Sequence, residues 1–261
     1  MRIDVHTHAF HPKIAQKVLD QLSDHYGITP VGDGTVDDLL ARAAHADLEK
    51  VMLHTAATDP SQVVPANNWA IELTRKHPEV VAFGSLHPDY QDNEREIERL
   101  TKAGITGLKF HPDFQGFFLD SPAFYQLMEM VPKRFTLMIH VGDDLPPEKN
   151  PSCPMKLAAL LRAFPGRRVI AAHMGGYLHW KWALEHLVGR DVFMDTSSTM
   201  AFIPDETLRA IWNGHPRERI LFGSDYPLFD PGAEMHMLQR RLALTDEALD
   251  SLLLNGAALL P

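Results

Sequence analysis

The sequence has a single cysteine, Cys153, among its 261 residues. One cysteine excludes an internal disulfide bond and a metal site built from several thiolates. The N-terminus also lacks the basic and apolar segments of a secretory leader, because a strand-like pattern begins at once. We therefore expect a cytoplasmic protein.

Long apolar runs and dense basic runs are missing as well. No apolar run approaches the roughly 20 residues needed to cross a bilayer. Acidic side chains outnumber basic ones by 34 to 25, and the formal charge of −9 argues against a nucleic-acid or anionic-membrane partner. We expect a small-molecule substrate as the partner. An apolar face on an outer helix would suit a homo-oligomer interface as well as a core.

The segment after the first strand-like run, HTHAFHP, contains no glycine. This argues against an open doubly wound sheet, which places a glycine-rich phosphate loop there. The chain instead alternates eight short β-like runs with amphipathic helical stretches, and eight such units close a (β/α)₈ TIM barrel. We predict one α/β domain over residues 1–261. The eight runs are 2–8, 50–56, 80–86, 105–110, 135–141, 168–174, 191–197 and 219–225.

Several segments between the runs have helical features. Residues 37–48 have one apolar face at helical spacing, and residues 245–254 are expected to form a closing helix. Ser121 before Pro122, and Asp205, are predicted helix N-caps. The proline-rich segment 143–154 is predicted to be a long active-site loop rather than a domain boundary.

Histidine occurs at or just after the ends of the first six runs, and aspartate ends the last two. Catalytic groups of TIM barrels lie at the C-terminal ends of the strands, so these positions point to one shared site. The seven histidines are a large share of the 15 in the chain. The strand-end residues are His6, His8, His54, His87, His111, His140, His173, Asp195 and Asp225.

The first run, RIDVHTH, is expected to send alternate side chains into the barrel. The predicted inward residues are Asp4, His6 and His8, and the outward ones are Ile3, Val5 and Thr7. A divalent metal needs three or four donors, and His140 and Asp225 would complete a set of three histidines and one aspartate. These donors suit Zn, Mn, Fe or Co better than Ca or Mg. Taken singly, each has a structural alternative, such as a helix N-cap for Asp225.

The strand-end motifs resemble, in order and spacing, those of the amidohydrolase superfamily of metal-dependent barrels. The branch they resemble most includes aminocarboxymuconate-semialdehyde decarboxylase. The resemblance implies one divalent metal, with zinc first, held by His6, His8, His140 and Asp225. It places His173 beside the metal-bound water or substrate, although the counterpart of His173 binds a second metal in binuclear relatives. The motifs are IDVHTHAFHP, GLKFHP, the histidine of MIHVG, AAHMGG, FGSDYP and LNGAALL.

Three further residues are predicted to bind substrate: Lys109, His111 and His54. Some superfamily members carboxylate a lysine of the fourth strand to bridge two metals. Lys109 occupies that strand, but the pattern GLKFHP goes with a single metal in the branch resembled. A substrate-carboxylate or aspartate partner is therefore the preferred role for Lys109, with a carbamate and a structural salt bridge as alternatives. Aromatic candidates for the pocket wall are Phe10, Phe114, Phe117, Tyr177, Trp180 and Tyr226.

The metal chemistry predicts a hydrolase. A bound divalent cation lowers the pKa of its water to about 7, Asp225 can act as general base, and His173 can stabilise an oxyanion. The expected substrate is an amide, lactone or ester of a small carboxylated molecule. Non-oxidative decarboxylation of a small carboxylic acid at the same site is the alternative enzyme activity. A non-catalytic metal-binding scaffold is a third class, disfavoured because the set of donors is complete.

Overall fold

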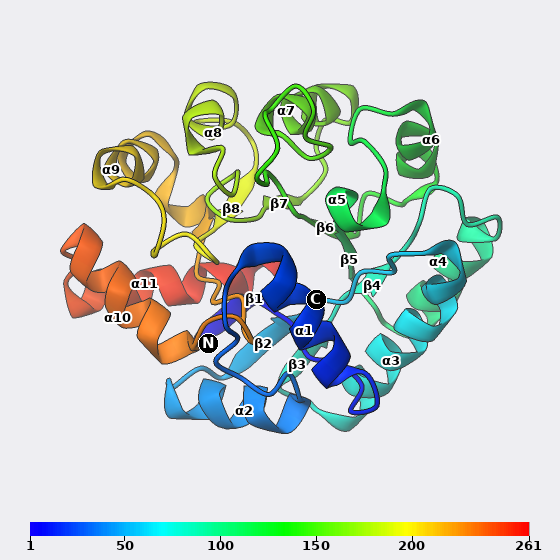
Figure 1. Cartoon of the computed structure of the whole chain (residues 1–261), viewed down its shortest axis with the longest axis horizontal. Coiled ribbons are helices and arrows are strands. Elements are labelled where there is room, and N and C mark those ends of the chain that lie inside the picture. The colour runs from blue at the N-terminus through cyan, green and yellow to red at the C-terminus, as the bar shows by residue number, and fades with distance from the viewer. Residues whose placement is uncertain (261) are drawn as a thin grey trace.

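Parallel strands alternate with helices along the chain, as predicted for a (β/α)₈ barrel. The structure is a computed structural model that describes residues 1–260. Figure 1 shows the strands at the centre and most of the helices around them. The strands are β1 (Ile3–Thr7), β2 (Lys50–Leu53), β3 (Val80–Ala82), β4 (Gly84–Ser85), β5 (Gly107–Phe110), β6 (Thr136–Ile139), β7 (Val169–Ala171), β8 (Phe193–Asp195) and β9 (Ile220–Leu221).

The strands fall at the eight predicted runs and are shorter than predicted. β3 and β4 are two parts of the third run, separated at Phe83. Parallel pairing runs through β1, β2 and β3 and then from β4 to β9. Backbone hydrogen bonds between β1 and the segment after β9 close the ring, including one of 2.9 Å from Val5 N–H to Phe222 O and one of 2.8 Å from Asp225 N–H to His6 O.

The helices follow the strands. They are α1 (Ala15–Tyr26), α2 (Val36–His45), α3 (Val63–Lys76), α4 (Asn93–Lys102), α5 (Pro112–Gln115), α6 (Pro122–Met130), α7 (Pro154–Ala163), α8 (Trp180–His186), α9 (Asp205–Gly214), α10 (Pro231–Leu242) and α11 (Asp246–Asn255), with short 3₁₀ turns at Pro60–Gln62, Arg217–Arg219 and Gly256–Leu259. None of the helices in residues 1–260 is both long and apolar enough to span a membrane.

The helix caps agree with the sequence at one predicted site and differ at the other. Ser121 caps α6, where its side chain accepts a hydrogen bond from Phe124 N–H. The prediction for Asp205 is wrong, because Pro204 occupies the cap position of α9 and Asp205 is the first helical residue. Its carboxylate instead pairs with Arg241 of α10.

The first strand departs from the predicted alternation of side chains. Ile3 and Val5 pack in one buried cluster with side chains from β6, β7 and β9, so they point inward rather than toward the helices. Asp4 lies between them on the other face of the strand, so the prediction is wrong for all three residues. The pairing of β1 with β2 shifts register between Asp4 and Thr7. This irregularity breaks the alternation of side chains, so that His6 faces the interior as Val5 does.

Residues 9–35, between β1 and β2, contain a helix that the sequence patterns did not single out. Figure 1 draws this helix, α1, in front of the strands, and its side chains line the same cavity as the strand-end histidines. The predicted active-site loop 143–154 has a different role. Among the residues described, none of its side chains lines the cavity. Its Asp143 carboxylate lies 3.1 Å from His25 Nε2 of α1, so the loop holds that helix in place.

Candidate metal centre

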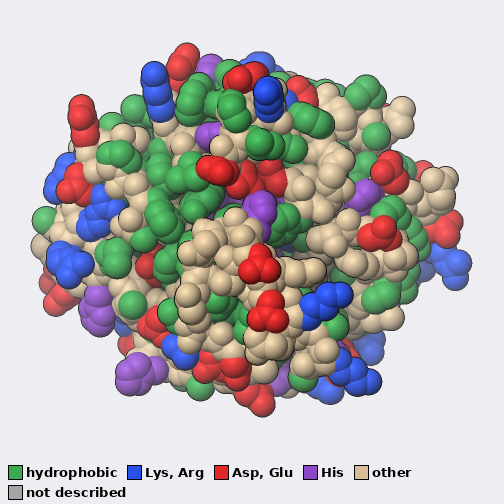
Figure 2. Space-filling view, viewed as in Figure 1, with side chains coloured by type: hydrophobic (Ala, Val, Ile, Leu, Met, Phe, Trp, Pro, Cys, Tyr) green, Lys and Arg blue, Asp and Glu red, His purple; other side chains and the backbone are tan. Residues whose placement is uncertain are grey.

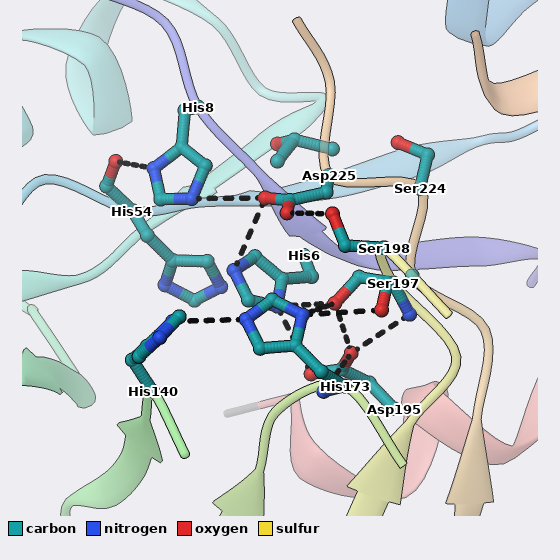
Figure 3. A network of polar contacts seen from close by, with 12 residues as sticks. His6, His8, His54, His140, His173, Asp195, Ser197, Ser198, Ser224 and Asp225 are labelled. Atoms are coloured by element: carbon teal, nitrogen blue, oxygen red, sulfur yellow. Dashed lines mark hydrogen bonds and ion pairs between the residues drawn. The ribbon is translucent and has the colours of Figure 1, made fainter. Parts of the chain in front are cut away.

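Histidine and aspartate side chains from four parts of the barrel meet at the C-terminal ends of the strands (Figure 3). His6 belongs to β1 and His8 follows it, His140 follows β6, His173 follows β7, and Asp225 follows β9. His173 and Asp225 have left-handed backbones, with φ of 61° and 65°. Such conformations are uncommon for residues other than glycine and cluster at functional sites.

His6 has one ring nitrogen held by a buried carboxylate and the other free to face the centre. Its Nδ1 donates to Asp195 Oδ2 at 3.0 Å, which leaves Nε2 unprotonated. Burial lowers the pKa of His6 to about 4, so the ring is neutral near pH 7. Burial alone would raise the pKa of Asp195, but attraction to His6 and its hydrogen bond outweigh that effect and bring the pKa to about 2. A carboxylate behind a histidine in this way is typical of metal ligands.

His8 is oriented in the same manner by a backbone oxygen. Its Nδ1 donates to the carbonyl of His54 at 2.9 Å. Its Nε2 then points at Asp225 Oδ1, 3.3 Å away, and His6 Nε2 lies 3.5 Å from the same oxygen. The ligand atoms of His6, His8 and Asp225 all lie within 4.8 Å of one another. Asp225 is also held by a hydrogen bond from the Ser198 hydroxyl.

His140 and His173 face each other next to this group. His140 Nε2 donates to Gly142 O at 2.8 Å, and His173 Nδ1 donates to Ser197 O at 3.1 Å. The remaining nitrogens, His140 Nδ1 and His173 Nε2, are 2.9 Å apart. Burial lowers the pKa of both rings, so both are neutral near pH 7. With His140 Nε2 and His173 Nδ1 donating to these carbonyls, the two facing nitrogens are acceptors, which suits a cation bound between them.

The donor set therefore fits a divalent cation. Four imidazole nitrogens and one carboxylate converge, and each imidazole has its outer nitrogen fixed by a carboxylate or a carbonyl. The set does not form one equidistant cluster. His6, His8 and Asp225 make the compact group, and His140 adjoins it through His173. Neutral imidazole and carboxylate are donors that suit Zn, Mn, Fe and Co.

The three residues predicted to bind substrate have different positions. Lys109 and His111 line the cavity, whereas His54 lies outside the lining. His54 is fully buried, and its Nε2 donates to Val5 O at 2.8 Å. The Nζ of Lys109 lies 3.1 Å from His6 Nε2, and burial lowers the pKa of this amine to about 8. His54 therefore does not line the cavity, and its backbone oxygen fixes the ring of His8 by accepting from His8 Nδ1.

The cavity that contains these groups has a volume of about 910 Å³. It opens on the face that Figure 2 shows, where acidic and histidine side chains gather near the middle. Of the aromatic candidates, Phe10, Phe114 and Tyr177 line it. The other three, Phe117, Trp180 and Tyr226, belong to the buried core.

Sequence patterns gave no role to the residues that orient the histidines. The sequence pattern marks Asp195 only as the end of a strand. Ser197 and Ser198 follow it in the run DTSS. Ser197 contacts both His6 Nδ1 and His173 Nδ1, at 2.9 and 3.0 Å. A polar run directly after a buried strand was the available signal. It could not show which histidines these side chains reach, because they lie far away along the chain.

Comparisons with known proteins identify the family of the chain. The model of the amidohydrolase family matches residues 3–260. The chain belongs to this family. A search of curated protein sequences found no match. The amidohydrolase-family assignment therefore rests on the family model, while solved structures give the likeness in fold.

Three solved structures illustrate that likeness, and at such low identity they show the fold alone. The 2,6-dihydroxybenzoate decarboxylase of Rhizobium is 16% identical, with a TM-score of 0.70, over 99% of this chain and 98% of that one. A dihydroxybenzoic acid decarboxylase of Polaromonas, with bound manganese, is 16% identical, with a TM-score of 0.68, over 99% and 96%. A putative 2-pyrone-4,6-dicarboxylic acid hydrolase of Pseudomonas putida is 17% identical, with a TM-score of 0.67, over 99% and 96%.

Proposed function

We propose that His6, His8, His140 and Asp225 hold one divalent cation, with Zn²⁺ as the first candidate. The supporting observation is that Asp225 Oδ1 lies 3.5 and 3.3 Å from the Nε2 atoms of His6 and His8, while His140 Nδ1 lies 2.9 Å from His173 Nε2 beside them. Mn²⁺ is the second candidate, because a decarboxylase of similar fold binds it. When bound, the cation supplies a Lewis acid that polarises a substrate oxygen and lowers the pKa of a water molecule.

The reaction we propose is hydrolysis of an amide, lactone or ester bond in a small carboxylated molecule. Asp225 accepts the proton of the attacking water at a carboxylate oxygen and returns it to the leaving group. His173, held at Nδ1 by Ser197 O, presents Nε2 to the cavity and exchanges a proton with a substrate oxygen there. The similar fold of the putative pyrone dicarboxylic acid hydrolase supports this reaction class.

Decarboxylation is the second candidate, and one observation favours it. Lys109 places an amine inside the cavity, 3.1 Å from His6 Nε2, and it forms no ion pair among residues 1–260. A buried amine without a carboxylate partner at this position suits a substrate carboxylate. Two of the solved structures of similar fold are decarboxylases of dihydroxybenzoates. In this reaction a group at the strand ends protonates carbon as carbon dioxide leaves.

Metal analysis tests the first part of the proposal. Purified protein reconstituted with Zn²⁺ or Mn²⁺ should retain about one equivalent after dialysis. His6→Ala should abolish that retention, and His236→Ala, which removes an exposed histidine of α10, should not. Equal retention by the two variants would show that the metal is not held at this centre.

A substrate screen tests the reaction. Amides, lactones and esters of small carboxylic acids are offered beside hydroxybenzoates, and released acid or amine is scored separately from released carbon dioxide. Hydrolysis predicts acid or amine release that disappears in Asp225→Asn. Release of carbon dioxide alone would refute hydrolysis and support the second candidate.

A further inference from the structure

The cavity extends well beyond the metal centre. One continuous space of about 910 Å³ has the strand-end histidines at one end and residues of α1 and α3 at the other. This volume is near the upper end of the range for small-molecule sites, which is roughly 300–1,000 Å³. A substrate that occupied only the metal centre would leave the outer part of this space empty.

The outer part is lined by one stripe of α1. Four large side chains recur every four residues, which places them on one face of the helix. Only Ala15 and Leu19 of this helix are buried against the rest of the protein. The first three side chains of the stripe face the cavity, and Ile14, at the N-cap of the helix, is 49% exposed, while Tyr26 also packs against the core. The members of the stripe are Ile14, Val18, Leu22 and Tyr26.

Two aromatic side chains also line this cavity. Phe10 follows β1 and stacks with His8 at 6.5 Å between ring centres. Trp69 of α3 is fixed by a hydrogen bond of 3.4 Å from its Nε1–H to Ala9 O. Both line the cavity together with the stripe on α1. An apolar group in this space would contact these aromatic rings as well as the stripe on α1.

The stripe is held in place at the C-terminal end of the helix. The hydroxyl of Tyr26 lies 3.3 Å from His111 Nε2, and His25 contacts Asp143 at 3.1 Å. After α1, the backbone N–H groups of Val31 and Gly32 donate to the carbonyl of Pro227, two residues after Asp225. The wall is therefore preformed, and little ordering is needed when a ligand binds.

We propose that the outer cavity is a distal subsite that binds an apolar arm of the substrate, such as a second ring or a short alkyl chain. The inference rests on the proposed function only in placing the polar head of the substrate at the metal centre. The cavity is continuous from Lys109 to α1, and this supports the proposal. An arm attached to a polar head near Lys109 can extend into the outer cavity. Burial of the arm between α1 and Phe10 would supply the hydrophobic part of the affinity.

Two ligands that share a head and differ in the arm test the subsite. Benzoate and biphenyl-4-carboxylate are titrated calorimetrically into the chain, with and without Mn²⁺. The second ring should tighten binding by about tenfold or more. Leu22→Asn should reduce this advantage to about threefold or less and leave benzoate unaffected. Leu184→Asn is the matched control, because Leu184 is 37% exposed on α8 and lies outside the cavity lining.

The outcomes separate this inference from the proposed function. Equal affinities for the two acids, or an advantage that Leu22→Asn leaves unchanged, would overturn the distal subsite. The advantage is a ratio between two ligands, so it should persist without Mn²⁺. A chain that retains no metal but still prefers biphenyl-4-carboxylate, with the preference lost in Leu22→Asn, would refute the metal centre and support the subsite.

Discussion

Replacing Asp195 with asparagine should weaken metal binding by about 10- to 100-fold, although Asp195 acts only through His6. Its Oδ2 accepts from His6 Nδ1 at 3.0 Å. Its Oδ1 accepts from the backbone N–H groups of His173 and Ser197, at 3.2 and 3.0 Å. Both oxygens of the carboxylate therefore act as acceptors, and an asparagine side chain keeps only one of them.

Either orientation of the asparagine disturbs the centre. If its oxygen faces His6, its NH₂ group meets two backbone N–H donors, and a buried mismatch of this kind costs about 1–3 kcal/mol. If its NH₂ group faces His6, the ring must accept at Nδ1 and carry its proton on Nε2. That proton occupies the nitrogen that faces the metal. A 10- to 100-fold loss corresponds to about 1.4–2.7 kcal/mol, which matches the cost of the mismatch.

Calorimetric titration with Mn²⁺ measures the affinity, and nitrogen NMR of His6 reports which ring nitrogen carries the proton. Asp191→Asn is the control, because Asp191 precedes the same strand and is 74% exposed. The control should bind Mn²⁺ as the unmodified chain does. An Asp195→Asn protein that binds Mn²⁺ within threefold of normal, with the proton of His6 still on Nδ1, would refute the reasoning.

Three other changes follow from the same structure. Burial, reinforced by nearby carboxylates, raises the pKa of Glu234 from 4.5 to about 8. The folded chain therefore binds a proton that the unfolded chain releases, and this contribution to stability is lost at about 1.4 kcal/mol per pH unit as the pH rises from 4.5 to 8. Urea unfolding across this range should show that Glu234→Gln removes this contribution, so that the stability of the variant falls less steeply with pH than that of the unmodified chain. Gly223→Ala would place a methyl carbon 2.8 Å from His6 Cβ, and thermal unfolding should show a loss of about 1–3 kcal/mol. Trp180→Phe removes a 2.9 Å hydrogen bond to His173 O, and urea unfolding should show a loss of about 1–2 kcal/mol with the metal content unchanged.

The alternation of strands and helices was readable from the sequence because it depends on local patterns. Short apolar runs bounded by polar residues predict strands, and the residues at their C-terminal ends predict where a barrel places its site. His6, His8, His140, His173 and Asp225 could be named in this way. The prediction needed no contact between distant residues, since every parallel strand of a barrel ends on the same face.

The direction of individual side chains depended on the tertiary structure. Strict alternation from His6 put Ile3 and Val5 on the outside of the barrel, but the register shift in β1 breaks the alternation, and Ile3 and Val5 point inward as His6 does. Position at a strand end could not separate His54 from His111, although one lies behind the cavity and the other lines it. The direction of a side chain and its access to the cavity both depend on register and packing between segments far apart in sequence. The pattern of a single strand contains neither.

The protonation of the site was likewise decided only in three dimensions. The sequence by itself determined that histidines and aspartates would gather at one end of a barrel. Only the fold brought Asp195 within hydrogen-bond distance of His6. It also placed His140 Nδ1 and His173 Nε2 2.9 Å apart. A histidine presents an unprotonated nitrogen to a metal when its other ring nitrogen donates to a carboxylate or a carbonyl. The segment that supplies this acceptor is determined by the tertiary structure.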